Sequence, residues 1–139
     1  MTSCLLDTGP LVAYLDAGDP KHAVCADALD AFEGRLLTTS AVVVEAMHLL
    51  GEARDGPQAL VKFLTRSHTQ IDECANLELL ERAATLMRKY HDLPMDFADA
   101  TLVLLAQKAS VTDVFTLDRR GFATYRTGTG RRFNLLPRL

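Results

Sequence analysis

The stretch SCLLDTGPLVAYL, residues 3–15, decides the fold of this 139-residue chain. It opens with a short apolar segment, Ser3–Leu6, which has the length of a buried strand. Asp7 follows at once, and Thr8-Gly9-Pro10 then offers a turn and a helix start with an early proline. The pattern predicts a strand that leads directly into a helix, which is the repeating unit of α/β folds.

The rest of the chain continues this alternation. We expect further strands at 36–38, 69–71, 114–117 and 133–135, and helices at 22–32, 39–50, 56–66, 77–90 and 96–109. The 77–90 helix is amphipathic, whereas apolar residues surround most of the 96–109 helix, which predicts its burial. Such alternation favours right-handed crossovers and a mainly parallel sheet covered on both faces. A single α/β domain over residues 1–139 is the expected organisation.

Composition excludes several classes of protein. Apolar residues make up 48% and charged residues 24%, which disfavours intrinsic disorder, collagen-like repeats and coiled-coil filaments. No apolar run approaches the ~18 residues that cross a bilayer, and the N-terminus lacks the basic start of a secretory signal. The three cysteines are scattered and never spaced as C-x-x-C, which disfavours a disulfide framework. We therefore expect a cytoplasmic protein without membrane association.

Charge is distributed unevenly along the chain. All 18 acids precede residue 119, whereas residues 119–139 carry six arginines and no acid. A basic strip beside an acidic body could bring a polyanion near carboxylates, although a solvated, arginine-rich terminus explains the same feature. Because the guanidinium fork matches phosphate oxygens, the candidate phosphate contacts to a nucleic acid are Arg119, Arg120, Arg126, Arg131 and Arg132.

Five acids stand where ligands gather in such folds, at or beside the carboxyl ends of the strands. Asp7 and Asp118 follow apolar strands, Asp96 and Asp99 stand three apart at a helix start, and Glu45 lies inside an apolar helix. Each has an ordinary structural explanation. The aspartates could form turns or helix caps, and Glu45 could belong to a solvent-facing stripe of its helix, unless that helix is buried nearly all round.

The combination of these acids indicates more than their separate positions do. Two carboxylates 4 Å apart repel by about 4 kcal/mol at an effective dielectric constant near 20, so a cluster requires cations or shifted pKa values. Oxygen ligands suit Mg²⁺ or Mn²⁺ better than Zn²⁺, and Mg²⁺ commonly keeps waters and phosphate oxygens. The sequence therefore predicts a divalent metal site that acts on a phosphate-bearing substrate.

Four segments, in this order, carry a family resemblance that covers the whole chain: CLLDTGPLVAYL (4–15), TSAVVVEAMHLL (39–50), PMDFADATLVLLA (94–106) and VFTLDRRGF (114–122). Together they resemble the PIN-domain ribonucleases, especially the bacterial VapC-type toxins. The resemblance implies a three-layer α/β/α sandwich with a mainly parallel sheet. It also implies an endoribonuclease that works as a homodimer and is silenced by a cognate antitoxin.

The resemblance also implies a set of site residues. Asp7, Glu45, Asp99 and Asp118 would hold Mg²⁺ or Mn²⁺, and Asp96 would be a further ligand or the partner of one. Whether Asp96 or Asp99 is primary stays open, although Asp99 followed by Ala100 matches the family better. Two hydroxyl residues, Thr8 and Thr116, match positions beside the first and last acids.

The chain departs from the family pattern at Gly121, where relatives often carry an acidic or polar residue. Two other functions remain open. A receiver-type signalling domain would also bind Mg²⁺, but it needs an acid pair near the first strand and a late lysine, and both are missing. A non-catalytic PIN-like module would bind RNA or a protein through a degenerate site, and only an assay separates it from an enzyme.

Overall fold

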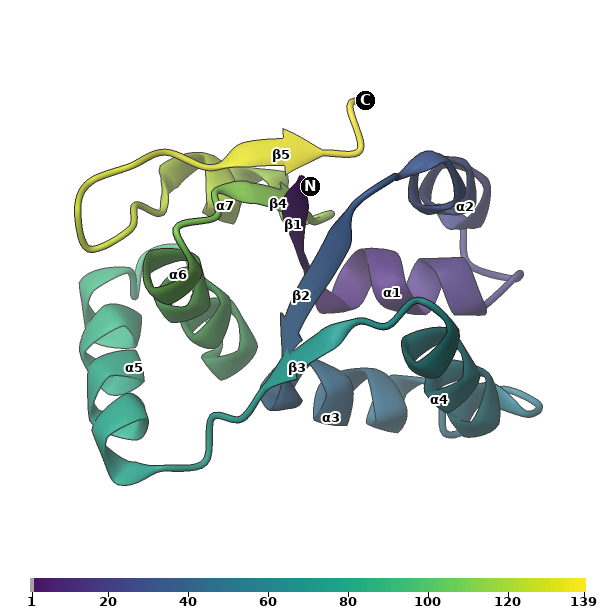
Figure 1. Ribbon diagram of the computed structural model, residues 1–139. Helices are drawn as coiled ribbons and strands as arrows, with labels where there is room; N and C mark the ends of the chain where they lie inside the picture. The colour runs from purple at the N-terminus through teal and green to yellow at the C-terminus, as the bar shows by residue number, and fades with distance from the viewer. Residues whose placement is uncertain (1) are drawn as a thin grey trace.

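The computed structural model describes residues 2–139 and contains five strands and seven helices (Figure 1). The first half of the chain supplies two strands and four helices: β1 (Ser3–Leu6), α1 (Thr8–Leu15), α2 (His22–Ala31), β2 (Arg35–Thr39), α3 (Ser40–Leu49) and α4 (Gly56–Arg66). The second half supplies the rest: β3 (Gln70–Asp72), α5 (Leu77–Lys89), α6 (Phe97–Ala109), β4 (Asp113–Phe115), α7 (Arg119–Thr124) and β5 (Asn134–Leu136).

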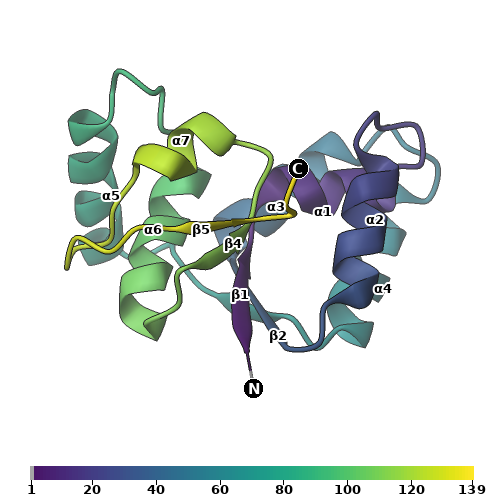
Figure 2. The same ribbon diagram turned by 90° about the horizontal axis from the view of Figure 1, so that it is seen from above.

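The strands form one sheet in the order β3-β2-β1-β4-β5, and every neighbouring pair is parallel. The central strand is β1, in which Leu5 pairs with Leu37 of β2 and Val114 of β4. Helices α1 to α4 lie on one side of the sheet and α5 to α7 on the other (Figure 2). The expected three-layer α/β/α sandwich with a parallel sheet is confirmed.

The core forms around the central strand and α6. Cys4, Leu5 and Leu6 of β1 are fully buried, as expected for a parallel strand covered on both faces. Helix α6 is buried along most of its length, which confirms the prediction from its apolar circumference. Because α6 packs beside α3, the helices that carry Asp99 and Glu45 are neighbours.

The structure decides two alternatives that the sequence leaves open. Asp118 could start a turn or cap a helix, and residues 119–124 form α7, a six-residue helix capped by Asp118. The apolar sequence of α3 allows burial nearly all round, but only one face of this helix reaches the core, and Val44 is 68% exposed. The valines of α3 therefore do not indicate a helix that is buried on all sides.

The cysteines, one turn and the hydropathy of the helices complete the description of the fold. The three cysteines are buried and free, so no disulfide joins the described residues. Residues 127–130 form a turn, with an antiparallel bridge between Arg126 and Arg132 beside it. In the part of the chain that the structure describes, we find no helix with the length and hydropathy that crossing a bilayer requires.

Candidate active site

Three of the candidate acids begin helices at the carboxyl end of the sheet. Asp7 caps α1 through a hydrogen bond from the Thr8 backbone N–H, at 2.8 Å. Asp118 caps α7 by accepting the Gly121 N–H at 3.1 Å, and Asp96 caps α6. The capping roles expected from sequence are thus real. They also fix these carboxylates at helix N-termini, where the helix dipole favours negative charge.

Thr116 connects the first and the last acid. Its hydroxyl donates to Asp7 Oδ2 at 2.7 Å, and the hydroxyl oxygen of Thr116 accepts the Asp118 N–H at 3.0 Å. The backbone N–H of Asp7 donates to the Phe115 carbonyl of the neighbouring strand at 2.9 Å. The paired ends of β1 and β4 therefore bring two residues 111 positions apart in sequence into one network.

Asp96 and Asp99 form a reciprocal capping box. The Asp99 N–H donates to Asp96 Oδ1 at 2.8 Å, and the Asp96 N–H donates to Asp99 Oδ2 at 3.2 Å. Their exposures differ: Asp96 is open to solvent, whereas Asp99 is only 9% exposed. A cap needs no burial, so the inward position of Asp99 has no explanation in capping alone.

Glu45 is half-buried on α3, and a buried pair of threonines ties this helix to α6. Thr101 donates to the Ala98 carbonyl, so the 2.8 Å contact between the Thr39 and Thr101 hydroxyls has Thr39 as donor. Glu45 and Asp96 line the same groove, of about 660 Å³. Glu45 could belong to a solvent-facing stripe of α3 that continues at His48. His48 is exposed, whereas Glu45 is half-buried, so this stripe is only partly present.

Burial and mutual repulsion raise the pKa values of the two inner acids. Asp7 is 6% exposed, and desolvation raises its pKa to about 6 against the hydrogen bonds from Thr116 and Thr8, with smaller contributions from the charges of Asp96 and Glu45. Desolvation also raises the pKa of Asp99, to about 8, together with the charges of Asp7, Asp96 and Asp118. Asp7 and Asp99 thus lie in the field of neighbouring acids, and an added cation would lower both pKa values.

The residues present fit a hard divalent cation. The ion pairs of the described residues are His91 with Asp92 and Lys108 with Asp72, so none of the five candidate acids has a basic partner. The Thr8 hydroxyl beside Asp7 is buried and has no hydrogen-bond partner within residues 2–139. Such a set of oxygen donors is the kind that Mg²⁺ and Mn²⁺ prefer.

The carboxylate oxygens are not gathered into a ready ligand set. Over the described residues, no three Asp, Glu, His or Cys side chains are arranged to hold one ion. Asp96, Asp99 and Asp118 instead direct oxygens at backbone N–H groups of helix starts. This arrangement is what mutual repulsion favours among acids of one sign, because each oxygen finds a donor and not a second carboxylate.

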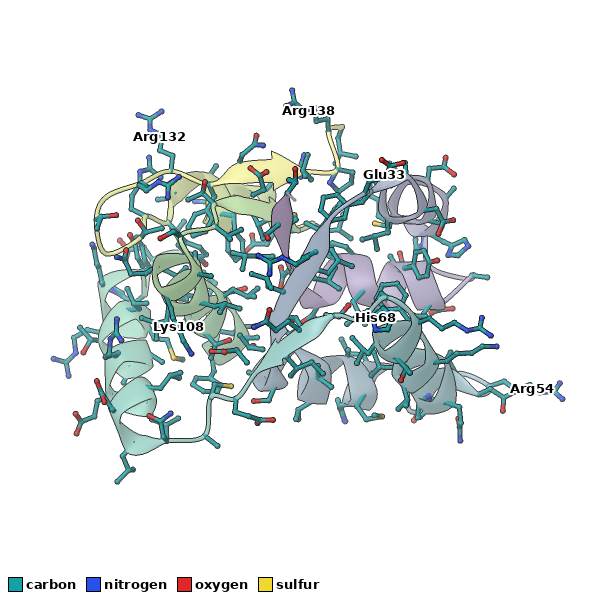
Figure 3. The ribbon with its side chains drawn as sticks, in the orientation of Figure 1. Glu33, Arg54, His68, Lys108, Arg132 and Arg138 are labelled. Carbon is teal, nitrogen blue, oxygen red and sulfur yellow. The ribbon has the colours of Figure 1, made fainter. Side chains whose placement is uncertain are left out.

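The candidate arginines differ in how free their side chains are. The half-buried Arg119 donates to the carbonyls of Thr116 and Pro137, and Arg126 donates to three carbonyls at the end of α7. Arg120, Arg131 and Arg132 are exposed. Figure 3 shows Arg132 projecting away from the body of the molecule, on the segment that leads to β5. These three guanidinium groups are accessible to a phosphate backbone, although one Arg131 nitrogen lies 3.5 Å from the Thr112 hydroxyl oxygen.

The sequence reasoning missed Tyr125, a fully buried residue directly after α7. Its pKa is raised, first by burial and then by the charges of Asp99, Asp118, Asp96 and Asp7. Its ring packs against Phe122, which lies three residues earlier. Phe122 and Tyr125 are three residues apart, so a prediction of helix α7 would have placed them on one face. This spacing is the only signal in the sequence that could have pointed to Tyr125.

Comparisons with known proteins agree with this geometry. The PIN-domain family model matches residues 4–127. The chain is 33% identical over 135 residues to ribonuclease VapC26 of Mycobacterium tuberculosis, and the match covers 96% of this chain and 99% of the relative. A crystal structure of VapC20 of the same organism, described as a toxin that cleaves the sarcin-ricin loop, has a TM-score of 0.71 at 18% identity and covers 80% of this chain and 86% of that one.

These findings decide the family. The VapC20 likeness shows the fold alone, whereas the family model and the VapC26 match extend over most of the chain. A receiver-type signalling domain is thereby excluded. The chain belongs to the PIN-domain family and is similar to the VapC-type ribonucleases within it.

Proposed function

We propose that this chain is a divalent metal-dependent endoribonuclease that hydrolyses RNA phosphodiester bonds with water as the nucleophile. One observation carries the proposal: two buried carboxylates, Asp7 and Asp99, lie in each other's field without a basic partner among the described residues. An unpaired buried acid costs several kcal/mol unless it is neutralised or binds a cation. The relative named a ribonuclease supports the same chemistry.

Asp7, Glu45, Asp99 and Asp118 would hold Mg²⁺ or Mn²⁺, and Asp96 would support Asp99. Burial favours Asp99 over Asp96 as the ligand, because Asp99 lies inward and Asp96 is exposed at the helix cap. When bound, such an ion activates water and stabilises the leaving oxygen in an in-line displacement.

Neighbouring residues of the chain fix the positions of these carboxylates. The Thr116 hydroxyl holds one Asp7 oxygen while the Thr8 N–H holds the other, so the carboxylate plane is fixed from two sides. The capping box fixes Asp99 in the same way at the start of α6. Thr39 and Thr101 keep α3 and α6 together, and this sets the position of Glu45 relative to Asp99.

The substrate we propose is RNA held by phosphate contacts from Arg120, Arg131 and Arg132. These side chains are exposed and come from the strongly basic last 21 residues. Phosphate contacts of this kind weaken steeply with added salt. We further propose that the protein is a cytoplasmic toxin, acts as a homodimer and is controlled by a cognate antitoxin.

The test is cleavage of total RNA and of tRNA by the purified protein with Mg²⁺, with Mn²⁺ and with EDTA. We expect cleavage with either metal and none with EDTA. Asp7→Asn should abolish cleavage while circular dichroism shows a folded protein, and Asp27→Asn, a change at an exposed acid on α2, is the matched control that should cut normally. Cleavage by the Asp7→Asn variant at the wild-type rate would overturn the proposal.

A further inference from the structure

Tyr125 lies beside the acids, and the reaction described above gives it no role. Its ring has a structural explanation, because it packs against Tyr90 and Phe122 with centroid separations of 5.0 and 5.1 Å. Its hydroxyl does not. Tyr125 is fully buried, and its oxygen has no hydrogen-bond partner among the described residues, although buried hydroxyls are nearly always paired.

Gly121 shows where this hydroxyl points. A Cβ added to Gly121 would lie 2.9 Å from the Tyr125 hydroxyl oxygen and closer still to Asp118 Oδ2. The Asp118 carboxylate therefore occupies the position that a side chain at residue 121 would take, with its Oδ2 toward the Tyr125 hydroxyl. The departure from the family pattern at this position thus has a steric consequence: any side chain would displace Asp118 or Tyr125.

The field of the site keeps the phenol protonated. The negative charges of the acids oppose ionisation of Tyr125, in the same direction as its burial. A protonated phenol is a hydrogen-bond donor, and the carboxylates around it are acceptors. Asp118 accepts the Gly121 N–H through Oδ1, so Asp118 Oδ2 is the acceptor that faces the unpaired Tyr125 hydroxyl.

We infer that Tyr125 is a positioning residue of the carboxylate site: its hydroxyl donates to Asp118 Oδ2 when that carboxylate turns to hold an ion, and so fixes the orientation of the carboxylate. The inference rests on the proposed function, because the orientation of Asp118 matters only where that acid holds an ion. Partners that orient metal ligands in this way typically contribute 10- to 100-fold to metal affinity or activity.

The experiment compares the full-length wild type with Tyr125→Phe, which removes one oxygen and keeps the ring. Titration with Mn²⁺, followed by the electron paramagnetic resonance signal of the free ion, gives the Kd. We expect Tyr125→Phe to weaken Mn²⁺ binding about tenfold and to lower kcat on RNA by a similar factor. The KM for RNA and the melting temperature in EDTA should stay unchanged, because the hydroxyl makes no bond within the protein.

Tyr90→Phe is the matched control. Tyr90 belongs to the same aromatic cluster, but its hydroxyl accepts the Arg126 backbone N–H at 3.2 Å. The control should melt at a lower temperature and bind Mn²⁺ as the wild type does. Gly121→Ala is an independent second variant, because its methyl group would push Asp118 Oδ2 away from the Tyr125 hydroxyl while both side chains remain, and we expect it to weaken Mn²⁺ binding as well.

The outcomes separate this inference from the proposed function. Mn²⁺ affinity equal to wild type in Tyr125→Phe, or in Gly121→Ala should Tyr125→Phe fail to fold, would overturn the role of Tyr125. An equal loss of affinity in Tyr90→Phe would also overturn it, since aromatic packing would then explain the effect. A wild type that binds Mn²⁺ but leaves RNA intact would overturn the nuclease function alone, and the Mn²⁺ comparison would still decide the role of Tyr125.

Discussion

The two ends of α6 carry charge in opposite ways. At its first turn, Asp99 is buried and has no basic partner among the described residues. At its last turn, the exposed Lys108 lies 3.2 Å from Asp72. Both charges suit the helix dipole, so the dipole alone does not distinguish them. The difference teaches that an exposed charge with a structural role is paired with an opposite charge. A charge buried without a partner indicates a functional site.

The largest effect is expected when Asp99, the unpaired acid at the first turn of α6, is neutralised. Asp99→Asn removes a proposed ligand and should lower kcat/KM on RNA at least about 100-fold, equivalent to a few kcal/mol of transition-state stabilisation. The same change relieves repulsion with Asp7 and Asp118, so the metal-free variant should melt at the same or a higher temperature. Initial rates and thermal melts check both halves. A large drop in melting temperature would mean that Asp99 is a structural acid.

The second prediction uses pH. Because folding raises the pKa of Asp7 to about 6 and that of Asp99 to about 8, the folded state binds protons more tightly than the unfolded chain does. The resulting stability is fully present below about pH 4, the ordinary range of aspartate, and is lost as the pH rises through 6 and then 8. In EDTA, the free energy of unfolding should therefore fall steadily between pH 5 and 8.

Two comparisons sharpen the pH experiment. Added Mn²⁺ should reduce the fall, because a bound cation favours the charged carboxylates. The double variant with Asp7→Asn and Asp99→Asn should show a flatter pH dependence in EDTA than the wild type does. Urea unfolding at each pH measures both effects. A wild type whose stability is constant across this range would contradict the raised pKa values.

The third prediction concerns the approach of RNA to an acidic site. Replacing Arg131 and Arg132 together by alanine should weaken RNA binding several-fold at low salt. The slope of log K against log salt should fall by about one for each phosphate that the variant no longer neutralises. Filter binding at several salt concentrations measures this slope. Replacing Arg126 instead should mainly lower stability, since its guanidinium is occupied by backbone carbonyls. An unchanged salt slope would remove Arg131 and Arg132 from the RNA interface.

The smallest effect is expected at the paired end of α6. Lys108→Ala should lower the free energy of unfolding by at most about 1 kcal/mol, because the lysine side chain is 70% exposed and surface ion pairs contribute little. Its kcat should equal that of the wild type. A loss of activity in this variant would show that charge far along α6 reaches the site.

Much of the fold followed from sequence, since the apolar strands and helix periods are strong local signals. The uninterrupted apolar residues of β1 and the apolar residues around α6 predicted that both elements are buried, and both are. Helix α7 was missed because its six residues are too short for a periodic pattern. The exposure of Val44 was missed because hydrophobicity alone does not say which face of α3 meets the sheet.

The site was predictable to a different degree. The positions of Asp7 and Asp118 after apolar strands pointed to one end of the sheet, and the pairing of β1 with β4 explains why the two are near each other. The inward position of Asp99 depends on how α6 packs against the rest of the molecule, which its spacing from Asp96 does not reveal. The hydroxyl of Tyr125 depends on a contact across a glycine and left no pattern in the sequence.

The most direct test of the central claim is the anomalous difference map of a crystal soaked in Mn²⁺. We predict one or two peaks within ligand distance of Asp7 and Asp99, with carboxylate oxygens of Glu45 or Asp118 turned toward them. A map with no peak beside Asp7 and Asp99 after soaking at millimolar Mn²⁺ would contradict a metal site built from these acids.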